Sequence, residues 1–271
     1  MKILKNVFIV AIILVLLLVL GVIGRGIYNN YFAESKNPIA KIEIENYGVI
    51  EVELYPEYAH NTVATFIKLA ENGFYNGKVL YGKDDLCLYA GRNAEGEVVV
   101  PKANMIDPEV EPGSDDDIEF QIDGEFVVNG YEENVLSHEE GVLTMIRYDY
   151  TQQIPTLTTE SYNSGNAQLG IMINNGRSLN GLYAGFGKII NGMDIVKKII
   201  ADIQFVEVPE EEKTGIDEFS TKPVIKSVTV DTFGKDYGVP YYEEFFDFEE
   251  YLVPFKLEKN IWKINWKMNV V

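Results

Sequence analysis

The chain has 271 residues, of which 46% are hydrophobic and 24% are charged, and its formal net charge is −19. This length suffices for one or two domains with a substantial core. The strong negative charge argues against a nucleic-acid partner, because phosphates attract a basic surface. The single cysteine, Cys87, excludes an internal disulfide and a zinc site built on several thiolates.

An apolar segment near the N-terminus predicts a membrane anchor. Residues 7–24 run for 18 residues without a charge. As a helix they span about 27 Å, close to the hydrocarbon thickness of a bilayer. Lys2 and Lys5 favour a cytoplasmic N-terminus, residues 1–6, with the bulk of the chain outside the cell membrane. The alternative is a cleaved signal peptide and a secreted protein. The run is longer than a usual signal-peptide core and no A-x-A site follows it, which favours a single-pass anchor.

A polar stalk and a β-hairpin follow the anchor. Residues 25–37 are short and polar and predict the stalk. In residues 39–46 and 49–55, apolar and polar side chains alternate on either side of a Tyr-Gly turn. This period of two predicts two antiparallel strands joined by a tight turn.

A helix and a second strand pair come next. Residues 63–73 carry apolar side chains at helical spacing, with Asn61 and Thr62 as predicted N-cap residues and a glycine at the end. In residues 74–92, two short apolar runs flank the charged sequence GKDD. Such a pattern predicts two strands around a turn, with side chains facing a core and a surface in turn.

The rest of the chain is mainly strands and loops. Proline-rich and acidic segments predict surface loops at residues 93–117, 148–166 and 206–223, and alternation or apolar runs predict strands within residues 118–147, 167–173, 183–190 and 224–233. Residues 193–203 predict a second helix, led by Gly192, with isoleucines on one face. About eight short strands and two helices, without a parallel βαβ rhythm, predict a mainly β protein with a closed antiparallel barrel.

Three further features of the sequence also lead to predictions. The C-terminal tail, residues 235–271, interleaves aromatic residues first with acids and then with lysines. Such a tail would dock on the barrel, extend a sheet, or touch a partner or the membrane. The acidic run at residues 114–117 lacks calcium-loop spacing and predicts a solvated turn. His60 and His138 are the only histidines and predict no metal site.

The order of these pieces resembles that of cyclophilin-type peptidyl-prolyl isomerases. Residues 39–77 are similar to the opening hairpin and first helix of that family, and residues 120–147, with GEF…NG…GVLTM, are similar to its middle segment. Residues 179–199, LNGLYAGFGKIINGMDIVKKI, resemble the most specific family signature, and residues 223–234 resemble the closing strand. The resemblance covers residues 38–234. It implies a closed eight-stranded antiparallel barrel capped by two helices, with a proline-binding groove on one face.

The chemistry of such a groove needs neither a cofactor nor a metal. Rotation about an X–Pro bond is slow because amide resonance gives a barrier of roughly 18–20 kcal/mol. An apolar pocket that grips the proline ring and a hydrogen-bond donor aimed at the prolyl nitrogen would lower that barrier. The resemblance implies that an arginine in an F-H-R-V segment supplies the donor, and that proline-containing peptides or exported proteins are the partners.

The family pattern breaks at the groove. F-H-R-V falls on residues 80–83, so that Gly82 replaces the arginine, whereas Gln168 retains the catalytic glutamine position. Tyr89 replaces a pocket glutamine, either as a plug or as a stacking face, and Gly170 replaces an aromatic floor. The resemblance implies a groove lined by Tyr81, Leu86, Cys87, Tyr89, Ile146, Arg147, Leu169, Gly170, Leu179 and Tyr183.

The missing arginine leads to two hypotheses. In the first, the chain is a membrane-anchored prolyl isomerase for exported proteins, with weak or lost catalysis. Lys83, Arg92 or Arg147 would then be the cations able to replace the arginine. In the second, the chain is a non-catalytic peptide- or protein-binding module on the same scaffold. Binding of peptides without turnover would separate the two hypotheses. An open groove could bind prolyl peptides, whereas a groove filled by Tyr89 or by residues 148–166 could not.

Overall fold

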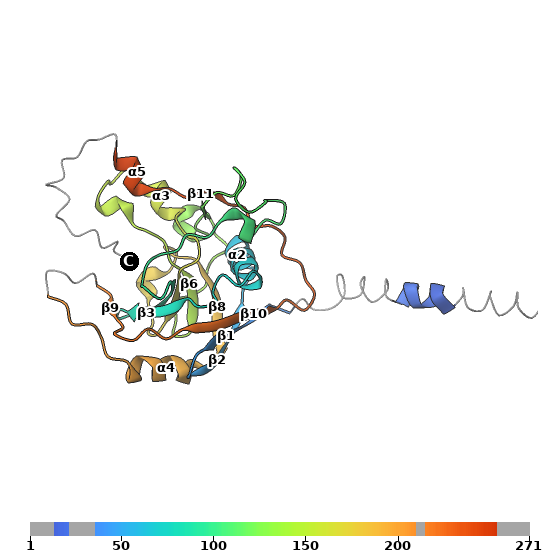
Figure 1. The fold of residues 1–271 in the computed structure, drawn as a ribbon, viewed down its shortest axis with the longest axis horizontal. Helices are drawn as coiled ribbons and strands as arrows, with labels where there is room; N and C mark the ends of the chain where they lie inside the picture. Colours follow the sequence, from blue (N-terminus) through green and yellow to red (C-terminus); the bar gives the residue numbers. More distant parts are fainter. Residues whose placement is uncertain (1–13, 22–35, 210–214, 254–271) are drawn as a thin grey trace, which may run out of the picture. The chain divides into compact units, whose positions relative to one another are not determined.

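The structure is a computed structural model that describes residues 14–21, 36–209 and 215–253. Of the predicted anchor at residues 7–24, residues 14–21 are helical and the remainder lies outside the described residues. Within the described part of the chain, no helix has the length and apolar character needed to cross a bilayer. Residues 37–209, 215–232 and 236–253 belong to one compact unit, which holds the β structure (Figure 1).

Nine strands of this unit form one antiparallel sheet in the order β10-β1-β2-β8-β6-β7-β4-β3-β9. Their bounds are β1 Ile39–Ile44, β2 Gly48–Leu54, β3 Val79–Lys83, β4 Cys87–Arg92, β6 Val142–Met145, β7 Leu169–Met172, β8 Gly185–Asn191, β9 Asp217–Glu218 and β10 Ile225–Asp231. A separate pair joins β5, Phe120–Gln121, to β11, Glu243–Glu244. The mainly β class and the antiparallel pairing predicted from the sequence are confirmed.

The prediction of a closed eight-stranded barrel needs correction. The sheet does not close on itself, because β10 and β9 are its two end strands and do not pair with each other. The end of β3 pairs with β9. The start of β3 meets the start of β10 through an isolated bridge between Val79 and Val224 and through backbone hydrogen bonds that join residues 77–80 to residues 223–225. The short strand β9 lies in the acidic loop 206–223, where the sequence shows no alternation. The result is a half-barrel whose two edges meet only over a short stretch, where residues 77–80 lie beside residues 223–225.

The predicted first hairpin is present. β1 and β2 pair with Ile42 opposite Ile50 and Ile44 opposite Gly48, and the turn residue Asn46 has a φ of 63°. Ile42, Ile44 and Ile50 are buried in the main core with the other apolar side chains of the two strands that face it. Alternation therefore predicts this part of the sheet correctly, because one face of the hairpin is buried and the other is not.

Helix α2, His60–Glu71, covers the core but begins differently from the prediction. Its N-cap position is Ala59, which makes no side-chain cap. The buried carboxylate of Glu125 instead accepts hydrogen bonds from the backbone N–H groups of Asn61 and Thr62, at 2.9 and 2.6 Å, and from the Thr62 hydroxyl at 2.7 Å. The predicted cap by Asn61 and Thr62 is wrong because a distant acid takes that role.

The second predicted helix is α4, Met193–Asp202, which follows Gly192 at a φ of 96° and packs against β2. Val196 and Ile199 are its fully buried residues. The remaining helical segments are short, namely α3 Thr158–Tyr162, α5 Phe248–Leu252 and the 3₁₀ turns Ala103–Met105, Val127–Asn129, Tyr150–Gln152 and Arg177–Leu179.

The described part of the tail docks on the β unit and also extends a sheet, two of the alternatives open from the sequence. β11 pairs with β5, and helix α5 lies near α3 in Figure 1. Aromatic residues 245–251 pack beside a buried cluster of Tyr148, Tyr150 and Leu157. Residues 254–271 lie outside the described residues.

Candidate functional site

The β3–β4 hairpin separates the main core from the candidate site. Leu80, Leu88 and Ala90 point into the main core. Their neighbours point the other way and form a second apolar cluster, made of Val79, Tyr81, Cys87, Tyr89, Val142, Ile146 and Met172. Because side chains alternate between the faces of a strand, this second cluster lies on the opposite face of the sheet. Four of the ten residues that the resemblance assigns to the groove belong to it, namely Tyr81, Cys87, Tyr89 and Ile146, and Leu86 and Leu179 pack against it.

At Gly82 the backbones of the paired strands β3 and β9 lie close together. A Cβ atom added at Gly82 would lie 2.7 Å from the backbone oxygen of Asp217 and 2.8 Å from the side chain of Ile216. The register shifts beside this residue, because Leu80 pairs with Ala90 whereas Gly82 pairs with Tyr89. Strand β3 therefore presents the side chain of Tyr81 to the site, and position 82 has room for glycine alone.

Two stacked tyrosines fill the site. The rings of Tyr81 and Tyr89 lie 5.9 Å apart with an interplanar angle of 20°. Their exposed fractions are 0% and 2%, which leaves no face of either ring open to a ligand. The Tyr89 hydroxyl donates to Asp84 at 2.7 Å, and the same carboxylate accepts from the backbone N–H groups of Leu86 and Cys87. Of the two roles predicted for Tyr89, the geometry favours the plug.

Gln168 joins this pair to a third tyrosine. The Tyr81 hydroxyl donates to Gln168 Oε1 at 3.2 Å, and Gln168 Nε2 donates to the Tyr148 hydroxyl at 3.1 Å. Gln168 is 2% exposed, and burial raises the pKa of Tyr148 to about 12. The retained glutamine thus has both ends of its amide occupied by the protein's own side chains.

The floor of the site is filled by aliphatic and sulfur-containing side chains. A Cβ added at Gly170 would lie 2.9 Å from Ile146 and 3.5 Å from the sulfur of Cys87, so an aromatic residue would not fit there. The Cys87 thiol donates to Met172 at 3.3 Å, and burial raises the pKa of this thiol to about 12. Leu169, which the resemblance also assigns to the groove lining, packs in the main core.

The far wall holds Leu179, Tyr183 and Arg147. Leu179 is half-buried against the second cluster and Tyr183 is buried. The Arg147 guanidinium lies 4.6 Å from the Tyr183 ring and 5.1 Å from the Tyr162 ring. Arg147 also donates to the backbone oxygens of Leu182 and Tyr148. These contacts hold the cation against aromatic faces and carbonyls.

The other two predicted cations lie at different depths. The Arg92 guanidinium lies 4.0 Å from the centre of the Tyr81 ring and 4.0 Å from Glu218. Lys83 pairs with Asp217 at 3.7 Å and lies 5.4 Å from the Phe205 ring. Arg92 therefore contacts the tyrosine cluster through the ring of Tyr81, whereas Lys83 is held beside β9 by its ion pair with Asp217.

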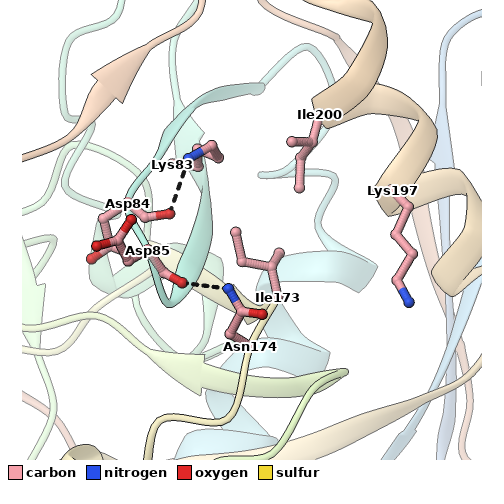
Figure 2. A pocket seen from close by; sticks show the side chains of 7 residues that line it. All are labelled: Lys83, Asp84, Asp85, Ile173, Asn174, Lys197 and Ile200. Carbon is pink, nitrogen blue, oxygen red and sulfur yellow. Dashed lines mark hydrogen bonds between the residues drawn. The ribbon is translucent and has the colours of Figure 1, made fainter.

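A hollow of about 300 Å³ lies beside the β3–β4 turn (Figure 2). Lys83, Asp84 and Asp85 line it from the turn, and its other lining residues are Ile173, Asn174, Lys197 and Ile200. Asn174 donates to the backbone oxygen of Asp85 at 2.7 Å and so braces the turn. Charged residues therefore share this lining with Ile173 and Ile200, and among the described residues no aromatic side chain lines it.

Neither histidine shows metal-site geometry. His138 is buried, with its ring nitrogens 3.2 Å from Asn180 Oδ1 and from the Thr144 hydroxyl, and burial lowers its pKa. His60 is exposed at the start of α2. In the ranges that the structure describes, no group of three or more His, Cys, Asp or Glu side chains could hold a metal ion.

The structure adds two residues to the site that were not assigned to it from the sequence. Asp84 orients Tyr89, and the charged turn GKDD followed by an apolar run is a weak signal for such a carboxylate cap. The loop 148–166 was predicted from the sequence as an alternative filler of the groove, and Tyr148 is the residue of this loop that reaches Gln168. The site is therefore a closed cluster of tyrosines around one buried amide.

Comparisons with known proteins agree with this fold. A family model described as cyclophilin type peptidyl-prolyl cis-trans isomerase/CLD matches residues 39–230. Peptidyl-prolyl cis-trans isomerase B of Bacillus subtilis is 27% identical over 156 residues, which cover 58% of this chain and 86% of that protein. Because the family model spans well over half of the chain, this protein belongs to the cyclophilin-type peptidyl-prolyl isomerase family.

Two solved cyclophilin structures are similar to this chain. A cyclophilin-type isomerase of Cryptosporidium parvum, crystallised in the presence of the dipeptide Ala-Pro, gives a TM-score of 0.48 at 18% identity, over 71% of this chain and 98% of that one. A cyclophilin of Hirschia baltica gives a TM-score of 0.43 at 20% identity, over 72% of this chain and 74% of that one.

Proposed function

We propose that this protein is a cyclophilin-type domain anchored at the outer face of the cell membrane, where it assists the folding of exported proteins with weak or absent isomerase catalysis. The observation that carries the catalytic part is the closed site, in which Gly82 stands at the arginine position and Tyr81 and Tyr89 are buried. The apolar run at residues 7–24, with Lys2 and Lys5 before it, supports the location.

The expected loss of rate has two sources. Removing one oriented donor from an enzyme site costs about 2.7–4 kcal/mol of transition-state stabilisation, which is a factor of roughly 10²–10³. In addition, a proline ring must displace side chains that are already packed and hydrogen-bonded, and this lowers the affinity for the substrate. Arg92 is the cation nearest the cluster, but its guanidinium is stacked on Tyr81 and lies beside Glu218.

A second candidate function is a non-catalytic peptide- or protein-binding module. The specific observation in its favour is that Gln168, the retained catalytic position, has both amide atoms bonded to tyrosine hydroxyls. In this form each end of the amide already holds a tyrosine hydroxyl and the side chain is 2% exposed, so a substrate amide has no access to it. Binding without turnover would separate this candidate from the first.

A proline-turnover assay tests the catalytic proposal. We expect the wild-type chain to be at least about a hundredfold slower than the Bacillus subtilis relative, which serves as the positive control. Lys83→Ala, Arg92→Ala and Arg147→Ala should leave any residual rate unchanged, since none of these cations replaces the arginine. Wild-type turnover equal to that of the relative would refute the proposal, and a selective loss in one alanine variant would identify a replacement cation.

The location is tested on intact cells that produce the full chain. An uncleaved anchor predicts a membrane-bound protein of full mass, 30.7 kDa, whose C-terminal part is cut by external protease. A shorter protein in the medium would instead support the signal-peptide alternative. A protease-resistant protein that is cut only after lysis would contradict both.

A further inference from the structure

The C-terminal tail lies across the loop that supplies Tyr148. Its strand β11 adds to the edge of β5, with the backbone N–H of Phe245 donating to Glu119 O at 2.8 Å. The backbone N–H of Phe246 donates to the side chain of Gln121 at 3.0 Å. Asp247 then caps the five-residue helix α5 (Figure 1). The tail is thus held by a short strand, by one turn of helix, and by the Asn61 side-chain amide, which donates to Tyr241 O at 2.8 Å and accepts from the Tyr241 N–H at 2.7 Å.

Aromatic rings connect the tail to the loop. Phe248 stacks on Tyr150 with ring centres 4.9 Å apart and an interplanar angle of 19°. Phe246 meets the same tyrosine edge-on at 5.3 Å. Phe245 lies edge-on to Tyr148 at 6.2 Å, and Tyr148 itself stacks on Tyr150 at 5.8 Å. Both tyrosines are buried, at 3% and 4% exposed.

Tyr148 is the point where the tail and the candidate site meet. Its ring packs against Phe245 of the tail, and its hydroxyl accepts from Gln168, which in turn accepts from Tyr81. Its backbone N–H is fixed by the Ser164 hydroxyl at 2.8 Å. A single side chain therefore carries a continuous series of contacts from the tail to the centre of the site.

We propose that residues 241–252 act as a strap that holds Tyr148 on Gln168 and keeps the site closed. Displacement of the strap frees Tyr148, uncovers Gln168 and makes the cluster accessible to an extended peptide. This inference rests on the proposed function, because it concerns access to the same site. The strap is suited to release, since a two-residue strand and a five-residue helix are short elements with few backbone hydrogen bonds.

The test is hydrogen exchange measured by mass spectrometry on the full chain. The release variant combines Phe245→Pro, which removes both the ring and the backbone donor to Glu119, with Phe248→Ala. We expect exchange in residues 146–168 to become about tenfold faster, because two ring contacts that hold the loop are lost. Exchange in β1 and β2 should stay unchanged. The matched control is Glu249→Ala, which alters an exposed residue of the same helix.

A second variant makes the result independent of global folding. Tyr148→Phe keeps the ring against Phe245 but removes the hydroxyl bonded to Gln168. We expect it to bind a proline-containing peptide more tightly than wild type while the tail stays protected. If the release variant frees the tail but residues 146–168 keep wild-type protection, the strap is refuted. This outcome is distinct from failure of the proposed function, which is judged by wild-type turnover alone.

Discussion

Restoring the family's arginine at position 82 should damage this protein instead of activating it. In Gly82→Arg, even the first side-chain atom would lie 2.7 Å from Asp217 O and 3.1 Å from the Cα of Glu218, whereas ordinary contacts begin at 3.4 Å. Both neighbours belong to the backbone of β9, so no side-chain rotation relieves the contact. The strand must move away, and its pairing with Gly82 and Lys83 is then strained or lost.

The size of the effect follows from overpacking. Inserting atoms into a packed position typically costs about 1–3 kcal/mol. For a domain of this size we therefore expect Gly82→Arg to lower the Tm by about 2–12 °C. Gly82→Ala should show most of this loss, because it adds only the colliding atom. Lys83→Arg adds a guanidinium to the neighbouring residue without a new Cβ, and it should keep the wild-type Tm.

Two measurements on the same variants decide the matter. Thermal unfolding followed by circular dichroism gives the Tm, and a proline-turnover assay gives the rate. Gly82→Arg with a wild-type Tm and a rate near that of the Bacillus subtilis relative would refute the reasoning. It would mean that β9 can move away from Gly82 without loss of stability and that Tyr81 and Tyr89 do not block the groove.

Three further predictions concern stability. Glu125→Ala removes three hydrogen bonds at the start of α2, including both from Thr62, and should cost about 2–3 kcal/mol in denaturant unfolding. Burial raises the pKa of Tyr148 and of Tyr183 to about 12. Their contribution to stability is therefore complete below pH 10 and is lost between about pH 10 and 12, so tyrosinate absorbance should appear together with unfolding, not before it. Burial lowers the pKa of His138, so stability should fall as the pH drops below about 6.5, and His138→Gln should flatten that slope in acid titrations.

The sheet was largely predictable because its strands give two kinds of pattern. β1, β2 and β10 bury one face and alternate, whereas β3, β4, β6 and β7 are buried on both faces and appear as short apolar runs. Alternation in residues 39–55 predicted β1 and β2, and the apolar runs around GKDD predicted β3 and β4. The two-residue strand β9 was missed, since pairing over two residues needs no pattern. The cap of α2 was also missed, because its acceptor, Glu125, comes from a segment more than fifty residues later and local sequence favoured Asn61 and Thr62.

The sequence predicted which residues form the site but not how their side chains pack in it. The resemblance brought together Gly82, Tyr89 and Gln168, and the structure places them in one region. What the sequence does not show is which side chain enters the space left by the arginine. That depends on the register shift beside Leu80 and on the tail packing at Tyr148, both of which arise from tertiary contacts.

The residues that depart from the family pattern pack together in a mutually compatible way. Glycine at position 82 lets β9 approach, and the half-buried Ile216 beside it packs on the second cluster. Glycine at position 170 leaves room for Ile146. Tyr81 and Tyr89 then fill the remaining space and satisfy their hydroxyls on Gln168 and Asp84. Because each change fits the others, reversing one of them leaves a clash or an unsatisfied polar group, so an open groove requires several changes at once or a movement of the loop that carries Tyr148.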